Sequence, residues 1–245
     1  MTNLYQDLAS VYEAMYQTFI DYEEEYLFYA NLLRKYAKQE VLEIACGTGN
    51  LANHFLQNGF DYQGLDYSPN MVEMAKKKAP VAEFLVGDMQ GFTLKTPLGS
   101  ILITARSISY MIENQQVINT VKSVHRNLKP QGIFCFDFID ANQFLPPMIN
   151  GKTVIHEASH DNIDYLRESF WSLDLQHGMT FQWDSTYYRK EGEKRIALGK
   201  DDSVVRTFMV NEMQLFLELN GFEVKEMISR KTYAFPTYVV VAEKI

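Results

Sequence analysis

The chain has 245 residues, of which 47% are hydrophobic and 22% charged, and its formal charge is -8 at pH 7. This composition excludes extended disorder and suits one α/β domain, or a smaller domain that carries an insertion. Because nonspecific nucleic-acid binding depends on clustered Lys and Arg, the acidic balance predicts a small-molecule partner and no nucleic acid.

The two cysteines, Cys46 and Cys135, lie in or beside apolar runs and form no C-x-x-C pair. We therefore expect two buried thiols in a reducing compartment. The N-terminus has no basic leader before an apolar segment, and no run approaches the roughly 18 apolar residues that a membrane span needs. The expected location is cytoplasmic, without membrane contact.

The first predicted elements are two tyrosine-rich helical segments within residues 2–36. From residue 41 to residue 139 strand and helix patterns then alternate, which is typical of a parallel sheet with helices on both faces. The strand candidates are residues 41–46, 62–66, 82–86, 100–105 and 133–139. The helix candidates are residues 49–58, 69–78 and 114–128.

Local signals fix two of these helix ends. Ser68 is a suitable N-cap with Pro69 at the first helical position. In the string LKPQG after the last helix candidate, Pro130 and Gly132 should stop the helix and turn the chain.

Residues 152–208 change character, because β-rich runs joined by Asn, Gly and Asp turns replace the alternating pattern. They predict an antiparallel meander inserted into the domain. A helix at about 210–220 follows, and then two strands, 222–229 and 237–243, that read as a closing hairpin-like pair. The expected organisation is a main domain of residues 1–150 and 209–245, with a helical cap at 1–36 and an inserted β subdomain at 151–208.

The stretch VLEIACGTGN, residues 41–50, places Glu43 inside a strand and Gly47 and Gly49 in the turn after it. The same turn fits the G-x-G-x-x-A fingerprint of dehydrogenases, so the motif alone leaves NAD and other nucleoside cofactors open. In an open parallel sheet the ligand lies across the carboxyl ends of the strands. There Asp66 is placed for ribose hydroxyls, and Asp88 in VGDMQ for the exocyclic amine of adenine.

The combination of E-x-x-C-G-x-G, an acidic strand end and G-D-M resembles the class I S-adenosylmethionine-dependent methyltransferases. The resemblance covers almost the whole chain, including LKPQG and the final strand. It implies a Rossmann-like α/β fold, with helices on both faces of a seven-stranded, mostly parallel sheet in the order 3-2-1-4-5-7-6 and an antiparallel last strand. It also implies S-adenosylmethionine as cofactor. Dehydrogenase glycines serve a pyrophosphate, which has little use for the upstream carboxylate of Glu43.

The resemblance also assigns site residues. The methionine moiety of the cofactor would be contacted or shaped by Glu43, Ala45, Gly47 and Gly49. The ribose would meet Asp66, the adenine Asp88 and Met89, and the adenosine would be flanked by Tyr67 and Met71. Two positions depart from the usual pattern: Gly99-Ser100 stands where many relatives have Asp, and Cys46 where others have Gly or Ala.

Two further segments extend the resemblance to residues near the methyl acceptor. VYEAMY, residues 11–16, resembles the N-terminal helix of small-molecule N-methyltransferases, notably the sugar-amine dimethyltransferases and the glycine methyltransferase type. There Tyr12 would cover the cofactor carboxylate and Tyr16 would lie nearer the substrate. In RSISYM, residues 106–111, Ser107 would touch the cofactor and Tyr110 would line the acceptor pocket.

Methyl transfer from a sulfonium is an in-line displacement that needs no covalent enzyme intermediate, so orientation and exclusion of water are the expected contributions of the protein. The sequence offers no compelling general base, although His156, His160 or His177 could face the cleft, and no cluster has metal-ligand spacing. The catalytic residue therefore stays unknown and no metal is expected. The residues expected to hold the acceptor are Tyr16, Tyr110, Asp137, Trp171 and Arg206.

The inserted strands alternate, with Arg167 and Trp171 on one face and Glu168 and Phe170 on the other. One face can cover the active site while the other meets solvent or a second subunit, which predicts a homodimer through this sheet. The favoured function is methylation of a small-molecule amine. The alternatives are an oxygen acceptor, a nicotinamide-dependent oxidoreductase, a non-catalytic or regulatory S-adenosylmethionine-binding module, and a tRNA or protein methyltransferase.

Overall fold

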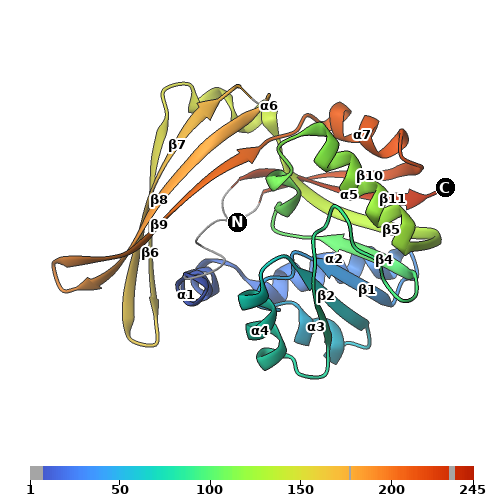
Figure 1. The fold of residues 1–245 in the computed structure, drawn as a ribbon, viewed down its shortest axis with the longest axis horizontal. Helices are drawn as coiled ribbons and strands as arrows, with labels where there is room; N and C mark the ends of the chain where they lie inside the picture. The colour runs from blue at the N-terminus through green and yellow to red at the C-terminus, as the bar shows by residue number, and fades with distance from the viewer. Residues whose placement is uncertain (1–7, 177, 232–234) are drawn as a thin grey trace.

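The computed structural model describes residues 8–176, 178–231 and 235–245 and contains two sheets (Figure 1). The larger sheet has seven strands in the order β10-β11-β5-β4-β1-β2-β3, and the smaller has four in the order β6-β7-β8-β9. The strands of the larger sheet are β1 (Glu40–Ile44), β2 (Asp61–Asp66), β3 (Glu83–Val86), β4 (Leu98–Ile103), β5 (Leu128–Ile139), β10 (Phe222–Lys231) and β11 (Pro236–Lys244).

The larger sheet confirms the predicted order 3-2-1-4-5-7-6. The pairs among β1 to β5 are parallel, whereas β11 runs antiparallel to both β5 and β10. This topology brings the carboxyl ends of β1, β2, β3 and β4 to one edge of the sheet, where ligands bind in open α/β folds.

Helices cover both faces of the larger sheet, as predicted. On one face α5 (Asn114–Asn127) and α7 (Val210–Glu218) bury Val121 and Met213 against strand residues such as Phe134. On the other face α2 (Tyr22–Lys35), α3 (Ala52–Gln57) and α4 (Pro69–Lys78) bury Tyr29 and Phe55. The two resulting cores, rich in fully buried aromatic rings, fix the strand tips rigidly.

Local capping explains why α4 begins and ends where the sequence predicts. The Ser68 hydroxyl accepts from the backbone N–H of Met71, and Pro69 occupies the first turn. The helix expected at 49–58 is shorter, since Gly49 has φ +73° and the helix begins only at Ala52.

The LKPQG segment differs from its prediction as a helix-ending turn. The helix α5 already ends at Asn127, and β5 begins at the next residue. The pairing of β4 with β5 jumps from Leu98↔Leu128 to Ser100↔Ile133, so residues 129–132 bulge out of the ladder. Gln131, with φ +57°, carries the left-handed kink of this bulge.

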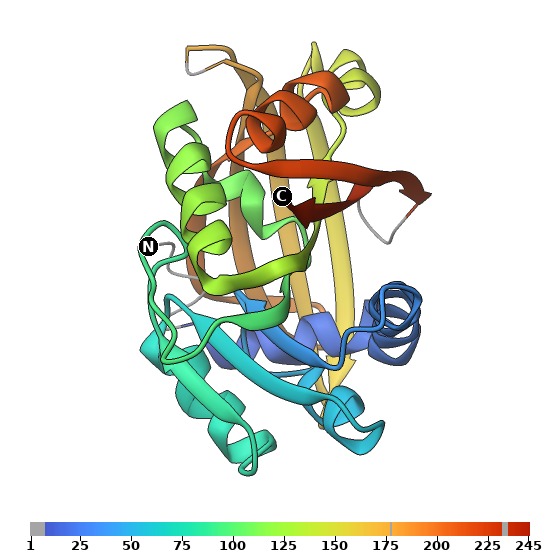
Figure 2. The same cartoon turned by 90° about the vertical axis from the view of Figure 1, so that its right-hand side faces the viewer.

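The smaller sheet is the predicted antiparallel meander. Its strands are β6 (Lys152–His160), β7 (Ile163–Asp174), β8 (Thr180–Glu191) and β9 (Lys194–Arg206), and each pairs antiparallel with the next. Figure 2 shows its long strands running behind the larger sheet. The short helices α6 (Ala141–Phe144) and η3 (Pro146–Met148) join the two sheets through a core that includes Phe144, Trp171 and Phe181.

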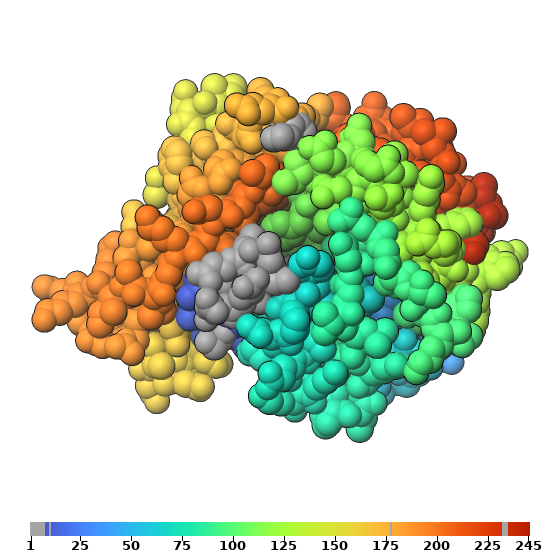
Figure 3. Space-filling view, in the orientation of Figure 1, coloured from blue at the N-terminus to red at the C-terminus, as the bar shows by residue number. Residues whose placement is uncertain are grey.

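The N-terminal helix α1 (Ala9–Phe19) lies between the two sheets (Figure 1). Its Met15 packs with Ala158 and Tyr187 of the smaller sheet. In the space-filling view the orange strands of the smaller sheet meet the green segment after β4 (Figure 3). Within the described residues, no helix combines the length and the apolar character that crossing a membrane would require.

Candidate active site

A cavity of about 600 Å³ lies where the strand tips of the larger sheet meet α1 and one face of the smaller sheet. The sequence-predicted residues that line it are Tyr12, Tyr16, Ala45, Gly47, Asp66, Tyr67, Met71, Asp88, Met89, Ser107, Tyr110 and Trp171. Four others that the sequence nominated, Glu43, Gly49, Asp137 and Arg206, are placed elsewhere. The topology therefore brings most of the predicted set together.

The turn after β1 owes its shape to left-handed backbone at Ala45, Gly47 and Gly49, with φ of 57°, 54° and 73°. A Cβ built on Gly47 would meet no atom within 4 Å, so this position opens onto the cavity. A Cβ on Gly49 would lie 3.0 Å from the Ala75 Cβ. Gly47 thus leaves room for a ligand, whereas Gly49 allows α4 to pack against the turn.

Asp66 ties the first two strand tips together. One carboxylate oxygen accepts from the Gly47 N–H at 2.8 Å, and the other from the Ser68 N–H at 2.8 Å. Burial raises the pKa of Asp66, although these backbone N–H groups oppose that shift. Each oxygen has a second lone pair, so the carboxylate can still accept from ligand hydroxyls such as those of ribose.

The third strand tip supplies Asp88 and Met89. The Asp88 carboxylate accepts from the Gln90 N–H at 2.8 Å, which fixes it at the cavity wall. The buried Met71 side chain lies on the same cavity, and Tyr67, which is 57% exposed, stands at its rim. This part of the wall combines the apolar side chains of Met71 and Met89 with the carboxylate of Asp88.

Glu43 lies beneath the turn and does not line the cavity. Its oxygens accept from the Tyr62 hydroxyl at 2.6 Å and the Thr104 hydroxyl at 2.8 Å, which links β1, β2 and the end of β4. Burial raises the pKa of Glu43 to about 7, and the two hydroxyls only partly counter this. Glu43 therefore supports Ile44 and Ala45, which do line the cavity.

Asp137 also supports the cavity wall from behind. Its carboxylate accepts from the Arg106 N–H at 2.7 Å, and burial raises its pKa to about 6. Ala105 and Arg106 are consecutive left-handed residues, with φ of 55° and 60°. Such backbone is costly outside glycine, so Asp137 holds the lining loop in a strained conformation, and it does not itself line the cavity.

Arg206 is a structural residue at the end of the smaller sheet. Its guanidinium donates to the Ile112 carbonyl and to the side chains of Asn114 and Glu212. These bonds join β9 to Ile112, which lines the cavity, and to the starts of α5 and α7, while Arg206 itself does not line the cavity.

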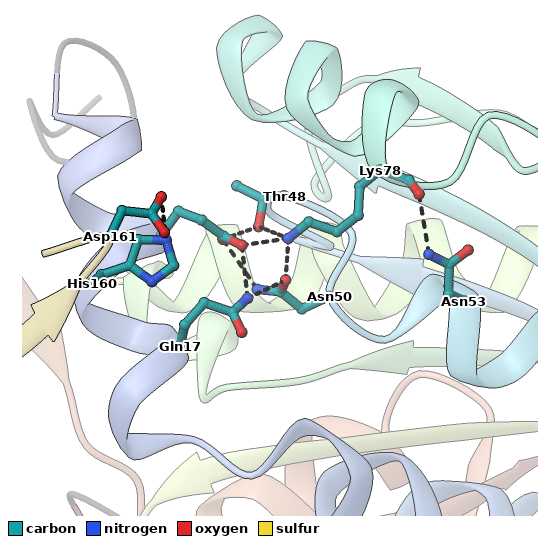
Figure 4. A network of polar contacts seen from close by, with 8 residues as sticks. Gln17, Thr48, Asn50, Asn53, Lys78, His160 and Asp161 are labelled. Carbon is teal, nitrogen blue, oxygen red and sulfur yellow. Dashed lines mark hydrogen bonds and ion pairs between the residues drawn. The ribbon is translucent and has the colours of Figure 1, made fainter.

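The N-terminal helix is fastened to the glycine turn by a polar network (Figure 4). The Glu13 carboxylate accepts from the Thr48 hydroxyl, the Lys78 ammonium and, at 3.2 Å, the Asn50 amide. Gln17 donates to Asn50 at 2.8 Å. Burial raises the pKa of Glu13, but the bonds from Lys78 and Thr48 prevail and lower it. This role was not predicted from the sequence, although Glu13 is the single charged residue in VYEAMY.

The smaller sheet contributes a wall of aromatic and basic side chains. Trp171 was predicted and His156 was one of three histidines that could face the cleft, whereas Arg167 and Trp183 were not assigned to the site. An Arg167 nitrogen donates to Nδ1 of His156 at 2.8 Å, and burial beside Arg167 lowers the pKa of His156 to about 4. Arginine has only donors, so neutral His156 carries its proton on Nε2.

The other two histidines considered from the sequence do not reach this wall in the described chain. His160 faces the Asp161 carboxylate at 3.5 Å and does not line the cavity. His177 lies outside the described residues. Over residues 8–176, 178–231 and 235–245 no group of three or more His, Cys, Asp or Glu side chains is placed to hold a metal ion.

Comparison with known proteins agrees with this geometry. Residues 41–132 match the family described as methyltransferase domain. The chain is 28% identical over 242 residues to the putative methyltransferase YqeM of Bacillus subtilis (strain 168), covering 96% of this chain and 92% of the relative. It is also 31% identical over 130 residues to dTDP-3-amino-3,4,6-trideoxy-alpha-D-glucopyranose N,N-dimethyltransferase of Streptomyces venezuelae, covering 52% of this chain and 55% of that enzyme.

Solved structures share the fold. Streptomyces venezuelae DesVI superposes with a TM-score of 0.83 at 22% identity, over 95% of this chain and 97% of that chain. The S-adenosylmethionine-bound amino pentose methyltransferase CalS10 from Micromonospora echinaspora gives 0.79 at 17% identity, over 96% and 97% of the two chains. The fold, the cavity and the sequence matches together support a class I S-adenosylmethionine-dependent methyltransferase, and the chain resembles the sugar N-methyltransferases.

Proposed function

We propose that this methyltransferase methylates an amine of a small-molecule acceptor. The main support for this proposal is a single continuous cavity of about 600 Å³ that lies between two unlike walls. The strand tips form the first wall, with Gly47, Asp66 and Asp88. The second wall has Tyr16, Tyr110 and Trp171, and it leaves space for a second ligand beside the cofactor.

The first wall fits S-adenosylmethionine. Gly47 presents bare backbone to the cavity, and Asp66 keeps acceptor capacity for ribose hydroxyls. Asp88 and Met89 would hold the adenine, and Tyr12 would cover the amino-acid end. When bound, the cofactor supplies a methyl group made electrophilic by its sulfonium.

The second wall would orient the acceptor and exclude water. Tyr12 and Tyr16 stack with ring centroids 4.0 Å apart, and Trp171 lies against Trp183 with centroids 5.5 Å apart. Such packed rings have few rotamers to lose, so they hold an acceptor at low entropic cost. Orientation alone contributes up to about 7 to 11 kcal/mol in favourable intramolecular reactions.

The burial of the second wall favours an amine acceptor in its reactive form. Arg167 and Trp171 are buried there, and loss of solvation lowers the pKa of an amine brought into such a site. The amine would therefore bind as the free base, whose lone pair can attack. His156, with its proton on Nε2, offers a donor to this space and no base.

The names of several relatives also support an amine. Enzymes of Streptomyces venezuelae, Saccharopolyspora spinosa and Streptomyces fradiae are each described as an N,N-dimethyltransferase of a dTDP-linked amino sugar. An amine-bearing small molecule is therefore the first acceptor class to test here.

The test has two stages. The demethylated cofactor product, S-adenosylhomocysteine, should raise the melting temperature of the protein, and NAD should not. Amino compounds and their hydroxyl counterparts are then incubated with the protein and S-adenosylmethionine, and mass spectrometry identifies the methylated products. We expect methylated amines. Methylation confined to alcohols would contradict the amine assignment, and thermal stabilisation by NAD alone would contradict the cofactor.

A further inference from the structure

Arg167 is a buried arginine on the second wall of the cavity. Only 3% of Arg167 is exposed to solvent. The pairings His156↔Arg167 and Arg167↔Tyr187 place these three side chains in one row across β6, β7 and β8. The row faces α1 and the cavity, because Arg167 and His156 line it and Tyr187 packs with α1.

The neighbours of the Arg167 guanidinium are neutral. It donates to the Tyr16 hydroxyl at 3.3 Å and to His156 Nδ1 at 2.8 Å, and it also bonds the Tyr187 hydroxyl. The rings of Tyr16 and Trp183 lie 5.7 and 5.4 Å from its central carbon. Its Nε is buried and has no hydrogen-bond partner.

The buried Arg206 and the half-buried Arg230 are each paired with a carboxylate. Arg206 is bonded to Glu212, and Arg230 lies 2.8 Å from Glu25. Across the described parts of the chain, Arg167 has no Asp or Glu oxygen within 4.0 Å. A buried guanidinium without a counter-ion is costly, and a ligand that supplies the negative charge would remove that cost.

We propose that the acceptor carries an oxyanion, a carboxylate or a phosphate, and that the Arg167 guanidinium binds it. This inference rests on the proposed function, because it names a second feature of the same acceptor. The unpartnered Nε and the donor nitrogens beside it match the two oxygens of such a group. The flanking rings favour a flat body next to the anion.

Charged groups elsewhere on the cavity agree with this location. Asp66 and Asp88 lie on the opposite, strand-tip wall, and Asp202 is an exposed residue of β9. Arg106 lines the cavity from the loop after β4. An anionic group is thus disfavoured at the cofactor wall and favoured between Arg167 and the aromatic rings.

The experiment measures probe binding to the full chain loaded with S-adenosylhomocysteine. Benzoate and phenyl phosphate are the anionic probes, and benzyl alcohol is the neutral control of similar shape. In calorimetry we expect at least one anion to bind about tenfold or more tightly than benzyl alcohol. The tighter of the two anions identifies the oxyanion as carboxylate or phosphate.

Variants assign the effect to Arg167. Arg167→Gln should weaken the anion about tenfold and leave benzyl alcohol unchanged. Arg189→Gln, on the exposed part of β8, is the matched control and should behave as wild type. If Arg167→Gln does not fold, Arg167→Met, which also removes the charge but keeps a long side chain, replaces it. For each protein, the affinities for the anion and for benzyl alcohol are measured on the same sample and expressed as a ratio. A partly unfolded fraction lowers both signals equally and does not change this ratio.

Three results are decisive. Equal binding of anions and benzyl alcohol by wild type would overturn the inference. So would an Arg167 variant that loses affinity for S-adenosylhomocysteine but not for 5′-methylthioadenosine, which lacks the amino-acid end, because Arg167 would then bind the cofactor carboxylate. If wild type binds no S-adenosylhomocysteine at all, the proposed function itself has failed.

Discussion

Three buried carboxylates, Glu43, Asp66 and Asp137, shape the cavity in different ways. Asp66 lines it, whereas Glu43 holds the strands beneath it and Asp137 holds the loop behind it. The sequence predicted that acidic residues gather here, because parallel strand tips meet at one edge. It did not separate lining residues from supporting ones, since that depends on hydroxyl and N–H partners from other strands.

Titration of Glu43 makes the free energy of unfolding depend on pH. Its pKa is about 7 in the folded protein and near 4.5 when unfolded, so the folded state binds the extra proton between these values. This contribution is fully present below pH 4.5 and is lost as pH rises through 7.

Glu43→Gln removes this titration while keeping a hydrogen-bonding side chain. Relative to the variant, wild type should lose roughly 2 to 3 kcal/mol of unfolding free energy between pH 5 and pH 8. Urea unfolding of both proteins across this range measures the difference, and other titrating groups cancel in the comparison. A free-energy difference that stays constant with pH would show that Glu43 does not titrate as described.

At the scale of elements, α1 connects the two sheets and the cofactor turn. Its aromatic residues pack on the smaller sheet, while Glu13 binds Thr48, Asn50 and Lys78 of the larger one. The helix therefore fixes the turn that carries Gly47 and also closes the cavity with Tyr12 and Tyr16.

Glu13→Ala should loosen this connection. The three donors lose their shared acceptor, which we expect to cost about 1 to 2 kcal/mol in cofactor binding, or roughly tenfold in affinity for S-adenosylhomocysteine. Glu73→Ala removes an exposed partner of Lys77 on α4 and is the control. If both variants bind the product as tightly as wild type, α1 does not position the turn.

Elements governed by local signals were predictable from sequence. The helix α4 matches its predicted bounds because Ser68 and Pro69 act within a few residues. The bulge at the start of β5 and the late start of α3 were missed, since both follow from tertiary pairing and packing. Arg167 was missed as a site residue for the same reason: its partner Tyr16 lies 151 residues away in the chain.

At the scale of the whole molecule, the smaller sheet covers the strand tips with its inner face and leaves its outer face to solvent. The outer face carries exposed Phe170 and Ile155, which are 47% and 55% exposed, beside polar residues such as Glu168 and Lys200. The predicted homodimer would use this face, and it stays a prediction.

Light scattering at micromolar concentration measures the dimer directly. We expect twice the mass of one chain for wild type, and one chain for Phe170→Glu, because burying an unpaired carboxylate in an interface is costly. Ile196→Glu, near the far end of the sheet, is the control. A wild-type protein with the mass of one chain contradicts dimerisation through this sheet.

The central claim is that three strand tips and one glycine turn form a binding site for S-adenosylmethionine. Calorimetric titration with S-adenosylhomocysteine tests it most directly, using wild type, Asp66→Ala and Asp61→Ala, which alters the exposed start of the same strand. We predict binding by wild type and Asp61→Ala, and affinity at least about tenfold weaker for Asp66→Ala. The absence of heat with wild type, or equal affinity of all three proteins, would contradict the account.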